Sequence, residues 1–224
     1  MDPLDRPVWN ALTTRQSNFA IGDGRAVRMA AEFGPFGAAA DGSAENLTAL
    51  AALIPENGEL WLVEAEPVGT PPDTVVRKQA LLVQMVAATI TPASGDLDIT
   101  MLTNADGPEM HALAVLTAPG PSHASTHELG RFVGIRVDGR LVAMAGERMR
   151  LAGHIEVSGV CTHPDFRGRG YAAILMRHVA MRIITEGDFP FLHSYASNTG
   201  AIMLYEKLGF KVRRTITATV IGRD

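Results

Sequence analysis

The sequence is short of the features that mark secreted and membrane proteins. It has a single cysteine in 224 residues, so no disulfide framework can stabilise the fold. Its 46% apolar residues are enough to form a substantial buried core. No apolar run approaches the roughly 18 residues of a membrane-spanning helix. The N-terminus, Met1 to Arg6, lacks the basic start and apolar stretch of a signal peptide. We therefore expect a cytoplasmic globular protein without a membrane partner.

The chain also lacks an excess of charge of either sign. Its formal net charge is −4, and the basic residues are spread along the chain rather than massed. Domains that bind nucleic acid usually carry a basic patch or stripe. We therefore expect no nucleic-acid partner.

Two apolar runs are interrupted near Thr91 to Leu97, where proline, serine and glycine occur together. This break predicts a boundary between an N-terminal α/β region of unknown role, residues 1–96, and a second region, residues 97–224. In the first region Ser43 can cap a helix with apolar residues at helical spacing. Strands are expected there at 60–64 and 80–86.

The second region is expected to form a strand, two helices, three antiparallel strands, a helix, a strand, a helix and a strand. Asp106 and Glu109 have the spacing of a capping box at the start of the first of these helices. Asp138-Gly139 is a typical hairpin turn. Apolar residues at i, i+3, i+4, i+7 and i+11 from Ala172 predict one buried helix face. The other expected bounds are 99–102 (strand), 125–132 (second helix), and 133–137, 141–145 and from 154 onward (antiparallel strands).

The most informative stretch is a strand, a turn and a helix start over residues 156–173. The turn, Arg167 to Ala172, opens the helix, so its backbone N–H groups point outward at the positive end of the helix dipole. Such a turn binds phosphate groups well. Its two glycines let the backbone approach phosphate oxygens closely, and its two arginines add charged donors. The turn therefore predicts a pyrophosphate-binding cradle.

The same turn has a second interpretation. Gly168-x-Gly170-x-x-Ala173 fits the dinucleotide fingerprint, with Asp188 about twenty residues further on. In a dinucleotide fold, however, the acidic residue ends the next strand, whereas Asp188 precedes a strand expected over 189–196. A nicotinamide-dependent oxidoreductase stays open as an alternative.

Arg167-x-x-Gly170-x-Ala172 resembles the acetyl-coenzyme A signature of the GNAT acetyltransferase superfamily: Arg or Gln, x, x, Gly, x, Gly or Ala. A second block after the next strand looks like the other half of that signature. It contains Asn198, Ala201, Leu204-Tyr205 and Gly209-Phe210. The match covers residues 156–214 and is most similar to the branch related to glycine N-acyltransferase.

The resemblance implies an α/β (α+β) fold, the GNAT acyl-CoA N-acyltransferase fold, with a mixed, mostly antiparallel sheet and the smaller N-terminal region beside it. It implies an N-acetyltransferase that moves an acetyl group from acetyl-CoA to a primary amine by direct attack, without a metal. The amine acceptor would be a small molecule or a peptide. A non-catalytic coenzyme A-binding module of the same fold is the alternative. The acceptor, the acyl length and a homodimer stay open.

The resemblance also implies which residues hold the cofactor. The strand before the turn would pair through its backbone with the pantetheine arm, and Asn198 would cap the following helix and meet the same arm. A backbone N–H of Val160 or Cys161 would polarise the thioester. The implied cofactor residues are Val160, Cys161, Thr162, Arg167, Gly168, Arg169, Gly170, Tyr171, Ala172 and Asn198. An acyl-cysteine at Cys161 is an alternative, although a lone thiol in an apolar strand is commonly a core residue.

Two residues are candidates for proton transfer. Glu156 lies where several family members place a general base, which would deprotonate the incoming ammonium. Its alternatives are a solvent-facing strand residue or an ion-pair partner of Arg148 or Arg150. Tyr205 lies where the family commonly has a tyrosine that protonates the departing thiolate; its alternative is a core residue in an apolar helix stripe.

The histidines do not have the spacing of a metal site. His123 and His127 are one helical turn apart, but Glu128 lies outside the pair, unlike in a zinc hydrolase. His193 and Tyr195 alternate on a strand and therefore share a face that could meet the acceptor.

Overall fold

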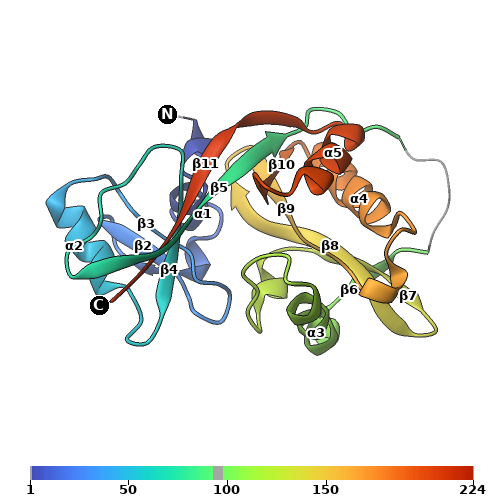
Figure 1. Ribbon diagram of the computed structural model, residues 1–224, viewed down its shortest axis with the longest axis horizontal. Coiled ribbons are helices and arrows are strands. Elements are labelled where there is room, and N and C mark those ends of the chain that lie inside the picture. The colour runs from blue at the N-terminus through green and yellow to red at the C-terminus, as the bar shows by residue number, and fades with distance from the viewer. Residues whose placement is uncertain (1, 93–97, 224) are drawn as a thin grey trace.

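The computed structural model describes residues 2–92 and 98–223. A long mixed sheet runs through both halves of the chain, and a small second sheet lies near the N-terminus (Figure 1). The helices are α1 (Pro7–Leu12), α2 (Ala44–Ala52), α3 (Gly107–Thr117), α4 (Tyr171–Thr185) and α5 (Thr199–Leu208), with short 3-10 turns η1 (Pro3–Asp5), η2 (Ser17–Phe19), η3 (Asn104–Asp106), η4 (Thr126–Leu129) and η5 (Pro164–Phe166). The strands are β1 (Ala20–Gly22), β2 (Ala26–Met29), β3 (Gly37–Ala39), β4 (Glu59–Glu64), β5 (Thr74–Val86), β6 (Thr100–Leu102), β7 (Phe132–Val137), β8 (Arg140–Leu151), β9 (His154–Thr162), β10 (Phe189–Tyr195) and β11 (Lys211–Arg223).

The large sheet has the strand order β4-β11-β5-β10-β9-β8-β7-β6. Among the described strands of this sheet, β9 and β10 are the one parallel pair, and all other neighbours are antiparallel. Strands β7, β8 and β9 form the antiparallel set that the sequence predicts. The prediction of a mixed, mostly antiparallel sheet is confirmed.

Strand β5 joins the two halves of the chain. It comes before residue 92, yet it lies between β10 and β11 and pairs antiparallel with both. In Figure 1, β5 and β11 run side by side from the left part of the molecule to its middle, where β5 meets β10. The predicted boundary at residues 96 and 97 lies outside the described residues, and the division into 1–96 and 97–224 stays a prediction. The sheet itself is continuous across the two regions.

Strands β9 and β10 separate after a short stretch of pairing. Their register runs from Phe189 opposite His154 to Phe191 opposite Glu156 and stops there. Beyond that point β10 stays paired with β5, and β9 stays paired with β8. The two parallel strands therefore diverge, and an opening forms between them in the middle of the sheet.

The local sequence signals are mostly confirmed. The Ser43 hydroxyl accepts a hydrogen bond from the Asn46 N–H at the start of α2, and the β7–β8 turn has positive φ at Asp138 and Gly139. The buried face of α4 consists of Leu175, Met176, Val179, Ala180 and Ile183. Ala172, which the apolar repeat includes, is half-buried.

Three local predictions need correction. The capping box uses Thr103 and Asp106 around η3, whereas Glu109 accepts hydrogen bonds from the Leu141 N–H and from Arg136. The helix expected over 125–132 is only the 3-10 turn η4, since β7 already begins at Phe132. Strand β5 begins at Thr74 rather than at residue 80 because its partner β11 is equally long and pairs along its whole length.

Candidate active site

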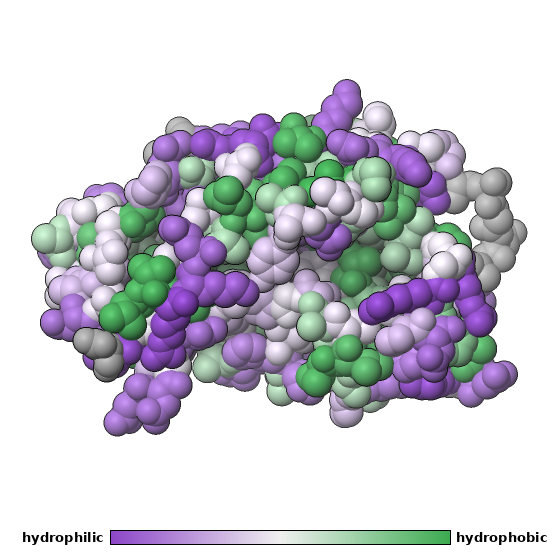
Figure 2. Space-filling view, in the orientation of Figure 1, coloured by the Kyte–Doolittle hydropathy of each residue, from purple (hydrophilic) through white to green (hydrophobic). Residues whose placement is uncertain are grey.

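The opening between β9 and β10 forms a cleft with a volume of about 170 Å³. Its walls come from the diverging strands, from the start of α5, from the loop after α3, and from strands of the N-terminal half. Figure 2 shows this face of the molecule hollowed near its middle, with apolar residues inside the hollow. The lining residues are Phe36, Trp61, Val63, Leu82, Pro119, Gly120, Pro121, Arg148, Val157, Ser158, Gly159, Val160, Met176, Leu192, His193, Ser194, Tyr195, Asn198, Tyr205 and Ala218.

A β-bulge shapes the β9 wall of the cleft. Ser158 pairs with Gly146 and Cys161 pairs with Met144, so two residues of β9, Gly159 and Val160, oppose a single residue of β8. Gly159 has φ 61°, and a Cβ there would lie 2.7 Å from the Phe132 ring. A bulge interrupts the ladder and leaves backbone groups unpaired. The backbone at Val160 therefore borders the cleft at the point where the resemblance implies that a thioester is polarised.

The predicted cradle has two glycines in the left-handed backbone region. Gly168 and Gly170 both have φ 78°, and Gly170 precedes the first residue of α4, Tyr171. A Cβ at either glycine would meet nothing within 4 Å, so the loop faces open space. Because α4 begins here, its first N–H groups have no partner within the helix and are available to an anion. The open loop and these N–H groups are compatible with a pyrophosphate group, whose binding here stays a prediction.

The two cradle arginines differ in their surroundings. Both are exposed. The Arg169 guanidinium lies over the Phe166 ring at 4.8 Å, whereas Arg167 makes no ion pair or side-chain hydrogen bond within the described residues. Of the two, Arg167 is the more readily available donor for a phosphate oxygen.

Cys161 and Thr162 do not line the cleft. Cys161 is buried in a cluster with α3, and burial raises the pKa of its thiol to about 11, with a smaller opposing effect of Thr117. The Thr162 hydroxyl is buried and has no hydrogen-bond partner among the described residues. The thiol is therefore a poor nucleophile, because the thiolate is the reactive form.

Glu156 lies behind the cleft in a buried ion pair with Arg148. Both oxygens accept hydrogen bonds from Arg148, at 2.8 Å each, and Oε1 also lies 2.8 Å from Nδ1 of His193. Burial raises the pKa of Glu156, but the charge of Arg148 and the hydrogen bonds from Arg148 and His193 outweigh it and hold the pKa well below its usual range. The ion-pair alternative is thus the arrangement that is found. The role of Glu156 as a general base stays a prediction.

Gln84 fixes the tautomer of His193. The Gln84 side-chain oxygen accepts a hydrogen bond from Arg213, so its nitrogen donates, and that nitrogen lies 3.0 Å from Nε2 of His193. Nε2 must then accept, and Nδ1 carries the proton donated to Glu156. In this arrangement the His193 ring is neutral, oriented from both sides, and placed in the cleft wall.

Tyr205 and Asn198 both line the cleft, from α5 and its start. The Asn198 side chain caps α5 by accepting a hydrogen bond from the Ala201 N–H, as the sequence predicts. Tyr205 is half-buried, and burial raises the pKa of its hydroxyl. No hydrogen bond of that hydroxyl occurs within the described part of the chain, so it is free to donate a proton to a bound group.

Sequence reasoning missed Arg148 as a cleft residue and Gln84 altogether. Gln84 belongs to β5 and reaches the site only because β5 lies beside β10. His193 and Tyr195, expected on one face, both line the cleft.

His123 and His127 do not form a metal site with a third ligand: no group of three or more metal-ligating side chains occurs in residues 2–92 and 98–223.

Comparison with known proteins identifies the family. A crystal structure of a GNAT-family acetyltransferase from Novosphingobium aromaticivorans is 50% identical, with both chains covered completely and a TM-score of 0.94. The chain belongs to the GNAT family of acetyltransferases. The model of the FR47-like protein family also matches residues 132–219, which include the β9–α4 cradle and α5. The expected GNAT fold is therefore confirmed.

Two further relatives are more distant. The [ribosomal protein bS18]-alanine N-acetyltransferase of Salmonella typhimurium is 32% identical over 94 residues, which is 40% of this chain; the match spans 63% of the length of that relative. A GCN5-related N-acetyltransferase from Kribbella flavida shares the GNAT fold, with 22% identity, a TM-score of 0.62, and coverage of 91% of this chain and 88% of its own. No helix in the described residues of this GNAT protein is long and apolar enough to cross a membrane.

Proposed function

We propose that this GNAT protein transfers an acetyl group from acetyl-CoA to a primary amine by direct attack on the thioester. The observation that supports the proposal is the cleft between β9 and β10, which is lined by the bulged backbone at Val160, the imidazole of His193 and the phenol of Tyr205. These are the groups that acyl transfer needs: an oxyanion donor, a base and an acid.

The cradle would hold the pyrophosphate of acetyl-CoA. Backbone N–H groups at Gly168 to Ala172 and the side chain of Arg167 are the donors, and Gly170 allows the close approach. Val160, Cys161 and Thr162 would pair through their backbone with the pantetheine arm, and Asn198 would meet the same arm from the other wall. Acetyl-CoA then supplies the activated acetyl group at the point where the strands diverge.

Proton removal from the amine is assigned to the Glu156–His193 pair. Both Glu156 oxygens are engaged, so the carboxylate would act through His193 rather than directly. When His193 Nε2 exchanges its contact with Gln84 for the substrate proton, the carboxylate stabilises the imidazolium that forms, and its orientation is already set. This arrangement keeps Glu156 in the reaction as a positioning residue.

Tyr205 is assigned as the general acid. When the C–S bond of the thioester breaks, the phenol gives its proton to the departing thiolate. Since burial raises the pKa of Tyr205, the group is protonated when this step occurs at neutral pH. Cys161 has no covalent role in this scheme.

The N-terminal half would supply the acceptor side of the site. Phe36, Trp61, Val63 and Leu82 are apolar residues of the N-terminal half that line the cleft. We assign residues 1–96 this role and residues 97–224 that of the catalytic region. We further infer that the chain belongs to the branch resembling glycine N-acyltransferase, because the match over residues 156–214 looks most like that branch. Its acceptor would be a small-molecule or peptide amine in the cytoplasm.

Binding and turnover test this proposal separately. Titration with acetyl-CoA, coenzyme A and NAD should raise the thermal unfolding midpoint only with the two coenzyme A compounds, by an amount equivalent to about 2.7 kcal/mol at 100 times Kd. Release of free thiol should then follow addition of an amine from a mixed panel of amino acids, peptides and polyamines. Binding without release for every amine would instead support the non-catalytic module, and a response to NAD alone would contradict the assignment of the cradle.

A further inference from the structure

One primary amine of the chain itself lies at the mouth of the cleft. The protein contains three lysines, Lys78, Lys207 and Lys211, and all three are exposed. Nζ of Lys78 lies 5.8 Å from the centroid of the Trp61 ring and 5.5 Å from that of the Tyr195 ring. Both rings line the cleft, whereas no contact of this kind is found for the other two lysines among the described residues.

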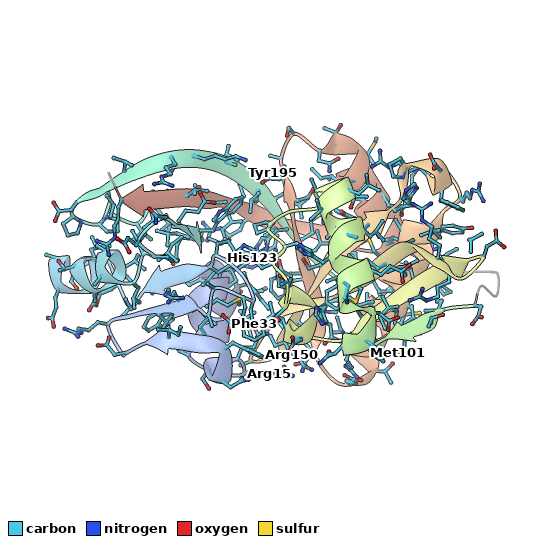
Figure 3. The ribbon with its side chains drawn as sticks, turned by 90° about the horizontal axis from the view of Figure 1, so that it is seen from below. Arg15, Phe33, Met101, His123, Arg150 and Tyr195 are labelled. Atoms are coloured by element: carbon cyan, nitrogen blue, oxygen red, sulfur yellow. The ribbon has the colours of Figure 1, made fainter. Side chains whose placement is uncertain are left out.

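Strand register explains why Lys78 points this way. Lys78 of β5 pairs with Val220 of β11, and Val220 pairs with Trp61 of β4, so these three side chains stand on one face of the sheet. Leu82 follows Lys78 at an even spacing and pairs with Tyr195. The face that carries Lys78 is therefore the face that forms the cleft wall. Figure 3 shows Tyr195 at the junction between the N-terminal elements and the rest of the molecule.

In the described part of the chain, the Lys78 ammonium is held only by its cation–π contacts with the two rings. It makes no ion pair within the described residues; Glu59, two residues from Trp61, accepts a hydrogen bond from the Trp61 indole instead. Cation–π contacts at exposed sites are worth about 0.5–1 kcal/mol. The long, flexible lysine arm can therefore leave the two rings and turn into the cleft.

We propose that Lys78 is a site of self-acetylation. This inference rests on the proposed function and extends it to an acceptor within the chain. Nζ, once its ammonium has given a proton to water, attacks the thioester carbonyl of acetyl-CoA, and the C–N bond forms as the C–S bond breaks. Tyr205 gives its proton to the departing thiolate, so coenzyme A leaves as the thiol, and the proton that the attacking nitrogen loses returns to Tyr205 through water. The product, Nε-acetyl-Lys78, has no charge and loses its cation–π contacts, so the cleft mouth loses a positive group.

The test is the site-resolved extent of acetylation after incubation of the full chain with acetyl-CoA, measured by mass spectrometry of peptides. Lys207 and Lys211 serve as internal controls for uncatalysed acetylation, because they are also exposed lysines of the same molecule. We expect Lys78 to be acetylated at least about tenfold faster than either, a difference of about 1.4 kcal/mol in activation free energy. The rate constant should not change with protein concentration, since the amine and the cleft belong to one chain.

Two variants complete the design. Arg167→Ala, which weakens the cradle, should slow acetylation of Lys78 without changing that of Lys207 and Lys211. Lys78→Arg should retain the cation–π contacts and give no acetylation at this position, while coenzyme A binding is unchanged. Equal rates at all three lysines, or a Lys78 rate that Arg167→Ala leaves unaltered, would overturn the inference.

These outcomes separate the inference from the proposed function. If acetyl-CoA binds and free amines are acetylated but Lys78 reacts no faster than the control lysines, the proposed function stands and self-acetylation is wrong. If acetyl-CoA neither binds nor supports acetylation of any amine, both fail.

Discussion

Arg148 and Glu156 face each other across β8 and β9 as a two-point ion pair, with Nε and Nη2 each 2.8 Å from a carboxylate oxygen. The Glu156 side chain is 1% exposed and the Arg148 side chain 13% exposed, so the pair is almost removed from water. On the other side of Glu156, His193 donates its Nδ1 proton to the same carboxylate. The pair thus anchors the imidazole that lines the cleft.

Glu156→Gln should destabilise the protein by about 3–5 kcal/mol at neutral pH, because it leaves the buried Arg148 charge uncompensated. The pKa of Glu156 is lowered in the folded state, so its contribution to stability is present above its usual pKa of 4.5 and is lost as the pH falls below it. Urea unfolding of both proteins at a series of pH values measures this. The difference in the free energy of unfolding between the wild-type protein and the variant should become smaller in acid. A difference that stays constant with pH would contradict the pKa shift.

Tyr205→Phe should lower kcat by about a hundredfold or more, the usual contribution of a positioned acid, with little change in acetyl-CoA affinity. Since burial raises the pKa of Tyr205, any loss of kcat at high pH caused by this group should begin only above about pH 10. Steady-state rates across pH, together with Kd for acetyl-CoA, measure both effects. Unchanged kcat in the variant would exclude the acid role.

Arg167→Ala should weaken acetyl-CoA binding about tenfold or more, because a charge-assisted hydrogen bond to phosphate is lost. Stability should stay the same, since Arg167 is exposed and has no partner within the described residues. Arg25→Ala is a matched control: it removes another exposed arginine, one that is paired with Asp23 and lies outside the cleft and the cradle. Calorimetric titration of both variants with acetyl-CoA measures the two affinities. Equal losses of affinity in the two variants would rule out a specific role for Arg167.

Cys161 should resist alkylation in the folded protein. Its thiol is buried, and burial raises its pKa to about 11, so almost no thiolate is present at pH 8. Iodoacetamide should label it at an appreciable rate only after denaturation. Rapid labelling of the native protein would reopen the acyl-cysteine alternative.

The parts of the site that depend on neighbouring residues could be predicted from the sequence. The glycines of the cradle, the Asn198 cap and the apolar face of α4 each follow from a local rule about φ, capping or helical spacing. The ion pair of Glu156 with Arg148 is among the alternatives that the sequence offers. The contacts that continue from Glu156 to His193 and on to Gln84 could not be predicted, because these residues come from three strands whose register is set by the whole sheet. The same holds for the cleft itself, which exists because β9 and β10 separate.

The position of β5 between β10 and β11 also determines how the protein can be made and cut. As the chain leaves the ribosome, β5 emerges long before β10 and β11. Both of its edges therefore lack their partner strands until nearly all of the remaining chain has been synthesised. A fragment that starts at residue 97 would lack the central strand that joins β10 to β11, and a fragment that ends before residue 189 would leave β5 with neither neighbour. Separate expression of either half should therefore give aggregating polypeptides, whereas co-expression of the two halves should allow them to assemble by strand complementation.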